Sequence, residues 1–266
     1  GGDLPDTALE AGAWLRGEAI AAYAQACGFR ADGGVPMTFP HILAFPLQMR
    51  LMLAGDFPYP VMGLVHLSNR IRQHAPLTAG EKLVITVRPG GLLAHDKGQA
   101  FSLETAVRRD GAVVWEGTSV YLRLGKAGRG DRAPVVPSPE EGGAPAETPI
   151  EAWPLPADLG RRYARVSGDA NPIHTSPLGA KLFGFRRPIA HGMWVKARAV
   201  AALTDGRAVE AGEVEVSFRA PVFLPGQIQL LAGPEGAERA FEIKDAQGAR
   251  THLRGRLSLK PQDPSC

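Results

Sequence analysis

A stretch of eight residues in the second half of the sequence, SGDANPIH, combines side chains that can transfer protons. It places a carboxylate at Asp169 and an imidazole at His174. Gly168 permits a tight or left-handed backbone directly before Asp169. Asn171 followed by a proline is typical of a helix N-cap and a first helical residue. We therefore expect a short helical turn that brings Asp169 and His174 toward a common point as an acid–base pair.

A second stretch, AHGM at residues 190–193, marks the expected start of a long helix. Amides in the first turn of a helix lack partners within the helix, and the helix dipole gives that end a partial positive charge. Gly192 lets a substrate carbonyl approach these amides closely, so we expect its N–H to lie in an oxyanion hole. His191 is expected to begin the helix and to support the site.

A carboxylate, an imidazole and an oxyanion hole suit proton transfer beside a thioester carbonyl. Covalent catalysis fits poorly, since no serine or cysteine near Asp169 and His174 has an activated setting. A metal site is not expected either, because apart from His174 and His191 the seven histidines are scattered singly. We assign no role to the other five, which are His41, His66, His74, His95 and His252.

The elements around these residues predict one long helix followed by several strands. Apolar residues recur at helical spacing from Met193 to Leu203, and Gly206 is a suitable end for this helix. Alternating apolar residues then predict four strands, in EVEVSFRAPVF, QIQLLAG, RAFEIKD and THLRGRLSL. One helix followed by an antiparallel meander is an α+β plan in which a curved sheet wraps the helix. That plan is a hot-dog domain.

The same order of elements occurs twice, which favours a duplication over chance similarity. The matching pairs are residues 23–28 with 163–168, residues 40–53 with 190–203, and residues 69–81 with 214–227. We therefore predict a double hot-dog fold with two tandem domains. The N-terminal domain covers residues 1–125, the C-terminal domain covers residues 151–266, and a linker rich in glycine and proline, residues 126–150, is draped on the surface.

The first half lacks the residues that would perform the chemistry. Phe29 stands where the second half has Asp169, and no Asn-Pro-x-His sequence follows it. Ile42 occupies the position that corresponds to Gly192, so close approach to the backbone is lost. Pro46 predicts a kink or a late start in the equivalent helix. The first half is thus expected to be catalytically inactive.

The stretch YARVSGDANPIH, followed by GFRRPIAHGM, resembles the hydratase-2 signature of MaoC-like (R)-specific enoyl-CoA hydratases and dehydratases. The resemblance implies a tandem form in which Asp169 and His174 are catalytic, Asn171 supports them and the Gly192 amide lies in the oxyanion hole. Water would add to a trans-2-enoyl thioester to give an (R)-3-hydroxyacyl thioester, or the reverse. The inactive half would pack against the active one and leave room for an acyl tail.

Several other residues are candidates for substrate binding. Phe185, Met193 and Trp194 are candidates for lining an acyl pocket, with core packing as the alternative. Arg186 and Arg187 are candidates for contacting the phosphates of coenzyme A, with a solvated surface pair as the alternative. Two other functions remain open: a hot-dog acyl-CoA thioesterase and a non-catalytic acyl-thioester-binding protein.

The amino-acid composition limits the number of domains and the kinds of partner that we expect. The 266 residues suffice for two domains, and 44% hydrophobic with 21% charged residues is ordinary for a globular protein. The net charge of +3 is spread along the chain, so neither nucleic acid nor a membrane is an expected partner. Two distant cysteines favour the cytoplasm. We expect no cofactor beyond coenzyme A or acyl carrier protein as substrate carrier, and either a monomer or a homodimer.

Overall fold

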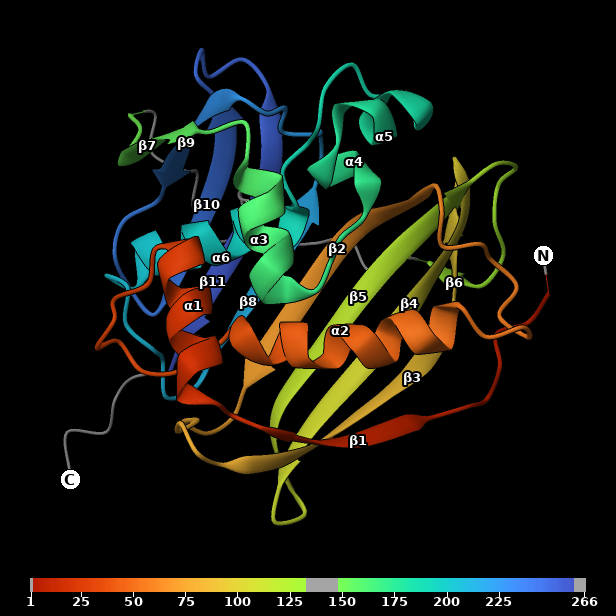
Figure 1. The fold of residues 1–266 in the computed structure, drawn as a ribbon, viewed down its shortest axis with the longest axis horizontal. Helices are drawn as coiled ribbons and strands as arrows, with labels where there is room; N and C mark the ends of the chain where they lie inside the picture. The colour runs from red at the N-terminus through yellow and green to blue at the C-terminus, as the bar shows by residue number, and fades with distance from the viewer. Residues whose placement is uncertain (1, 133–147, 261–266) are drawn as a thin grey trace.

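The computed structural model describes residues 2–132 and 148–260. Within these ranges one eleven-stranded, largely antiparallel sheet runs through both halves of the chain, with helices packed against it (Figure 1). The sheet order is β1-β3-β4-β5-β2-β8-β11-β10-β9-β7, and β6 pairs in parallel with β3 at the side of this path. The order of the first five strands is mirrored in the last five, as a duplication requires.

The first half contributes six strands and two helices. They are β1 (Leu9–Trp14), α1 (Gly17–Cys27), α2 (Phe39–Met52), β2 (Leu64–Gln73), β3 (Lys82–His95), β4 (Gly98–Arg109), β5 (Ala112–Leu124) and β6 (Asp131–Arg132). The long α2 lies across the strands of this half (Figure 1).

The second half repeats this order with two extra short helices. Its elements are β7 (Glu151–Leu155), α3 (Leu159–Ser167), α4 (Pro172–Thr175), α5 (Pro177–Leu182), α6 (Gly192–Leu203), β8 (Gly212–Phe218), β9 (Gly226–Ala232), β10 (Glu238–Asp245) and β11 (Thr251–Leu259). The extra helices α4 and α5 carry and follow the motif at residues 167–174. This is the part of the duplicated unit in which the two halves differ most.

The long helices follow the sequence pattern, with one correction. Helix α6 ends at Leu203, and Gly206 adopts a left-handed conformation (φ 70°) just beyond it, as expected of a helix stop. Of the two alternatives predicted from Pro46, the late start is wrong, because α2 begins at Phe39 and continues through Pro46, while the kink stays a prediction. Proline costs a helix one hydrogen bond, but nine residues of α2 are buried and their packing holds the helix together. No helix in the described ranges is both long and apolar enough to span a bilayer.

The predicted linker falls only partly within the described residues. Asp131 and Arg132 form β6 against β3, and the Ile150 amide donates to the Leu230 carbonyl at the start of the second half. Both described flanks of the linker therefore contact the half to which they are attached. Residues 133–147 lie outside the described ranges, and the domain boundaries at 125 and 151 stay a prediction.

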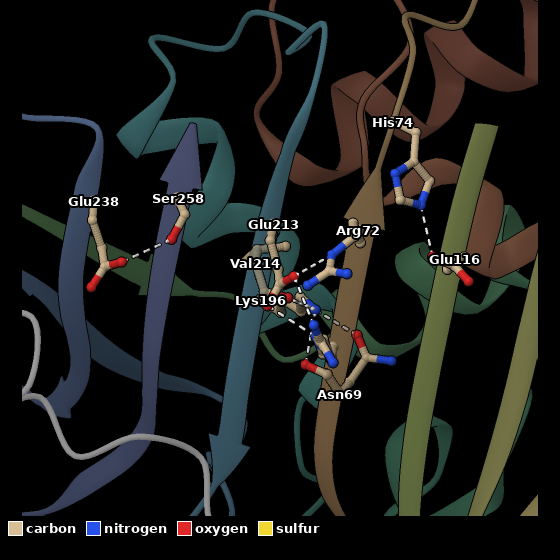
Figure 2. A network of polar contacts seen from close by, with 10 residues as sticks. Asn69, Arg72, His74, Glu116, Lys196, Glu213, Val214, Glu238 and Ser258 are labelled. Carbon is tan, nitrogen blue, oxygen red and sulfur yellow. Dashed lines mark hydrogen bonds and ion pairs between the residues drawn. The ribbon is translucent and has the colours of Figure 1, made fainter. Parts of the chain in front are cut away.

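The two halves meet where β2 pairs with β8, in antiparallel register with Ile71 opposite Val214. A fully buried Lys196 from α6 reinforces this seam (Figure 2). Its ammonium donates to the Asn69 carbonyl at 3.1 Å, the Asn69 side-chain oxygen at 2.5 Å and the Val214 carbonyl at 3.1 Å. At the exposed side of the same seam, Glu213 accepts from two arginines of β2 at 2.6–3.0 Å. The second half is thus bonded to the first through side chains as well as through the sheet.

Replacing Lys196 by methionine should lower the free energy of unfolding by about 2 kcal/mol, because hydrogen bonds from a charged donor are lost and buried carbonyls are left unpaired. Methionine keeps the unbranched apolar stem, so the change isolates the ammonium. Urea denaturation measures the effect, and Lys97→Met, at an exposed lysine, is the matched control. Equal stability of Lys196→Met and the wild type would contradict a stabilising role for the buried ammonium.

Candidate active site

A cavity of about 820 Å³ lies between the two halves. Its walls come from α2, the start of β2 and the end of β5 in the first half, and from α4, α6, the end of β8 and the start of β11 in the second. Most of the lining is apolar. The polar group that stands out within it is formed by Asp169, His174 and His191, which offer side-chain atoms within 4.8 Å of one another.

The loop between α3 and α4 holds the carboxylate in place. Gly168 ends α3 in a left-handed conformation with φ 76°. The Asn171 side chain accepts a hydrogen bond from the Ile173 amide at 3.2 Å, which makes it the N-cap of α4. The Asp169 carboxylate in turn accepts from the Asn171 amide at 3.2 Å. The predicted cap and short turn are therefore confirmed, and Asp169, with 28% of its side chain exposed, faces the cavity.

His174 is oriented by the chain segment that follows α5. Its Nδ1 lies 2.8 Å from the Ile189 carbonyl oxygen. A carbonyl can only accept, so Nδ1 carries the proton and Nε2 of the neutral ring has a free lone pair. Burial lowers the pKa of His174, and the nearby Asp169 carboxylate offsets only part of this effect. The ring is thus held as a neutral base beside a carboxylate.

His191 occupies the N-cap position of α6, as the sequence suggested. Its Nε2 donates to the backbone carbonyl of Asp169 at 2.9 Å, and its ring stacks on His174 with centroids 3.7 Å apart. Burial, followed by the His174 ring, holds the pKa of His191 well below its ordinary value. One side chain therefore contacts both members of the pair.

The three side chains lie close enough for a metal-binding geometry, and hydrogen bonds occupy one ring nitrogen of each histidine. The Nε2 proton of His191 is donated to a carbonyl, and its Nδ1 is buried without a partner. In this tautomer the free lone pair of His191 is on Nδ1, which has no hydrogen-bond partner among the described residues. The expectation that no metal binds here stays a prediction.

Gly192 is the first residue of α6 and lines the cavity next to His191. Its amide is in the first helical turn, where N–H groups have no intrahelical partner. A Cβ atom at this position would lie 2.8 Å from the Phe218 ring. Glycine is thus required at this position for close packing against Phe218 of β8. The oxyanion role of Gly192 stays a prediction that this placement allows.

The candidates for acyl binding separate into two groups. Phe185 and Met193 line the cavity. Trp194 does not line it, and its indole N–H donates to the Ala26 carbonyl of the first half at 2.8 Å. Trp194 therefore lies in the contact between the halves. The alternative interpretation, core packing, applies to this residue.

The two arginine candidates lie outside the main cavity, in a neighbouring polar pocket of about 540 Å³. The guanidinium of Arg186 lies 4.6 Å from the centre of the Phe223 ring, and that of Arg187 lies 5.7 Å from it. Arg187 also donates to the Pro225 carbonyl at 3.2 Å. Contact with carrier phosphates stays a prediction for both.

Sequence reasoning missed the contribution of the first half to the polar part of the cavity. His41, His66 and Tyr121 line it together with the predicted catalytic motif of the second half. A signal was available for His41, which aligns with His191 in the duplicated helix. Nothing in the local sequence indicated that His66 and Tyr121 face the same space.

Comparison with known proteins follows the division into halves. Residues 142–255 match the family described as MaoC like domain, and residues 20–116 match the FAS1-like dehydratase domain region. The 3-hydroxyacyl-thioester dehydratase X of Mycobacterium tuberculosis is 36% identical over 211 residues, which cover 79% of this chain and 74% of that protein. The peroxisomal enoyl-CoA hydratase 2 of Arabidopsis thaliana is 27% identical over 220 residues, 77% of this chain and 71% of that protein.

Solved structures agree. The crystal structure of HtdX from Mycobacterium tuberculosis superposes with a TM-score of 0.81 at 29% identity, covering 96% of this chain and 100% of that one. A MaoC-like dehydratase from Phytophthora capsici superposes with a TM-score of 0.79 at 21% identity, over 99% and 98% of the two chains, and supports the fold alone. The predicted α+β double hot-dog fold is confirmed. The chain belongs to the MaoC-like dehydratase family.

Proposed function

We propose that this protein is a hydro-lyase that hydrates trans-2-enoyl thioesters to (R)-3-hydroxyacyl thioesters and catalyses the reverse dehydration. The observation that carries the proposal is the facing pair of the Asp169 carboxylate and the neutral His174 ring in a cavity with apolar walls. The relatives named as 3-hydroxyacyl-thioester dehydratase and enoyl-CoA hydratase support the same reaction class.

In this mechanism one water molecule donates its two hydrogens to the Asp169 carboxylate and to Nε2 of His174. The water oxygen bonds to the β-carbon as one O–H bond breaks, and the electron pair of the double bond moves toward the thioester carbonyl. The Gly192 amide stabilises the enolate-like oxygen. The proton taken from water then passes to the α-carbon, so one water is consumed and both protein groups return to their starting states.

The substrate carrier is coenzyme A or acyl carrier protein, both of which present phosphate groups. Arg186 and Arg187 border the polar pocket beside the main cavity, and we assign them to those phosphates. The acyl chain would lie in the apolar part of the cavity, where Phe185 and Met193 of the second half meet residues of α2.

Asp169→Asn and His174→Ala should each lower kcat/KM for crotonyl-CoA hydration by about 100-fold or more, because each removes one proton acceptor. Loss of the enoyl absorbance measures hydration, and thiol release measured in parallel detects thioesterase activity. Asp158→Asn and His95→Ala, outside the cavity, serve as matched controls. Near wild-type turnover in either folded variant would contradict the mechanism, and stoichiometric thiol release would favour a thioesterase.

Gly192→Ala should lower kcat by about 100-fold or more, because the new methyl group forces the Phe218 ring and the oxyanion amide apart. Gly17→Ala is the matched control, since Gly17 also begins a helix and has nothing within 4 Å of its Cβ position. Adding Phe218→Leu to Gly192→Ala should restore part of the loss if displacement is its cause. Full activity of Gly192→Ala would exclude the proposed oxyanion hole.

The kcat/KM for hydration should fall with decreasing pH only below pH 6.5. Burial keeps the pKa of His174 below this ordinary value, so the ring is a free base at pH 6.5 and is protonated only at lower pH. We expect kcat/KM to be level from about pH 8 to 6.5 and to fall only below that range. NMR titration of the His174 ring checks the assignment, and a midpoint at or above 6.5 would contradict it.

A further inference from the structure

Two histidines of the first half line the cavity, although this half has no counterpart of Asp169. His41 lies on α2 and is only 5% exposed, and His66 lies on β2. Both line the cavity. Nε2 of His66 is buried without a hydrogen-bond partner among the described residues, while the Ser68 backbone is a partner of the same ring. Buried polar groups normally have partners, so Nε2 of His66 is an available acceptor for a ligand in the cavity.

A row of neighbouring rings leads from Gly192 to His66. The Phe218 ring packs against the backbone of Gly192. His66 contacts the other end of this row, with its ring 4.8 Å from that of Phe218 and 4.6 Å from that of Tyr121. The cavity wall therefore runs from the oxyanion amide past Phe218 to His66. A thioester carbonyl placed at Gly192 would direct its acyl chain along this wall.

An ordinary alkyl chain would leave Nε2 of His66 unpaired. The neighbouring lining from the first half is apolar and sufficient for such a chain, and it includes Ile42, Phe45, Met49, Met52 and Val61. A buried polar group without a partner costs about 1–3 kcal/mol. A hydroxyl group on the chain would remove that cost.

The protonation state narrows the ligand chemistry. Burial lowers the pKa of His41 to about 3 and that of His66 to about 3, and the buried Lys196 ammonium and the proximity of the two rings act in the same direction. Both rings are therefore neutral near pH 7. The His66 ring donates to the Ser68 backbone, so its unpaired Nε2 is an acceptor for a ligand hydroxyl, and a neutral His41 ring has one donor and one acceptor. A neutral oxygen matches them, whereas a carboxylate would enter a buried space without a cationic partner on these rings.

We propose that His41 and His66 form a specificity site for enoyl thioesters whose acyl chain carries a hydroxyl group beyond the reacting double bond. This inference rests on the proposed hydratase function and defines its substrate class. The inactive half then recognises the distal part of the substrate while the active half performs the hydration.

The test compares ω-hydroxy-trans-2-enoyl-CoA with unsubstituted trans-2-enoyl-CoA of the same chain length, over a series of increasing lengths. For at least one length, the wild type should show a kcat/KM about tenfold higher for the hydroxylated substrate, which corresponds to about 1.4 kcal/mol. His66→Phe retains a ring between Tyr121 and Phe218 but removes the nitrogens, and His41→Phe removes those of the second ring. Each variant should lower the ratio of the two kcat/KM values toward one.

His74→Phe is the matched control, because His74 directly follows the same strand and pairs with Glu116 at the surface. It should leave the ratio unchanged. A wild type that hydrates the unsubstituted substrates but shows no preference at any length overturns the specificity site and leaves the proposed function standing. A preference that survives both phenylalanine variants also overturns it. A wild type that hydrates neither substrate overturns the proposed function, and the inference with it; these wild-type measurements require no folded variant.

Discussion

The pairing of β2 with β8 is the constraint on which the arrangement of the molecule depends. It joins two half-sheets into one and fixes α2 and α6 on either side of a shared cavity. Without it, the apolar walls of the first half and the polar cluster of the second would be separate surfaces. The Lys196 ammonium strengthens the same pairing from inside, with hydrogen bonds to backbone on both strands. Formation of the site and association of the halves are thus one event.

The site itself is organised by backbone carbonyls more than by side chains. The Ile189 carbonyl fixes the tautomer of His174, and the Asp169 carbonyl fixes that of His191. These contacts link the loop before α4, the segment after α5 and the start of α6. The relative position of the predicted acid–base pair therefore depends on how these three segments of the chain pack against one another. Their shared burial also keeps both rings neutral.

Local sequence signals predicted what is local in the structure. The Asn171 cap, the left-handed Gly168 and the helix from Gly192 are set by residues within a few positions, and each was predicted. Trp194 shows the limit, because helical spacing places it correctly on α6 but does not tell which side of the helix meets the other half. His66 and Tyr121 reach the cavity through strand pairing across the first half, which no short window of sequence contains.

The mirrored strand order has a consequence for how such a protein can change. The groups assigned to proton transfer lie on the second half, while much of the wall that would meet the acyl chain lies on the first. Mutations in α2 or β2 can alter the shape and polarity of that wall without touching the Asp169 loop. After duplication, the residues for the reaction and many of the residues for substrate range are thus on different halves. One half can diverge in sequence while the other is conserved.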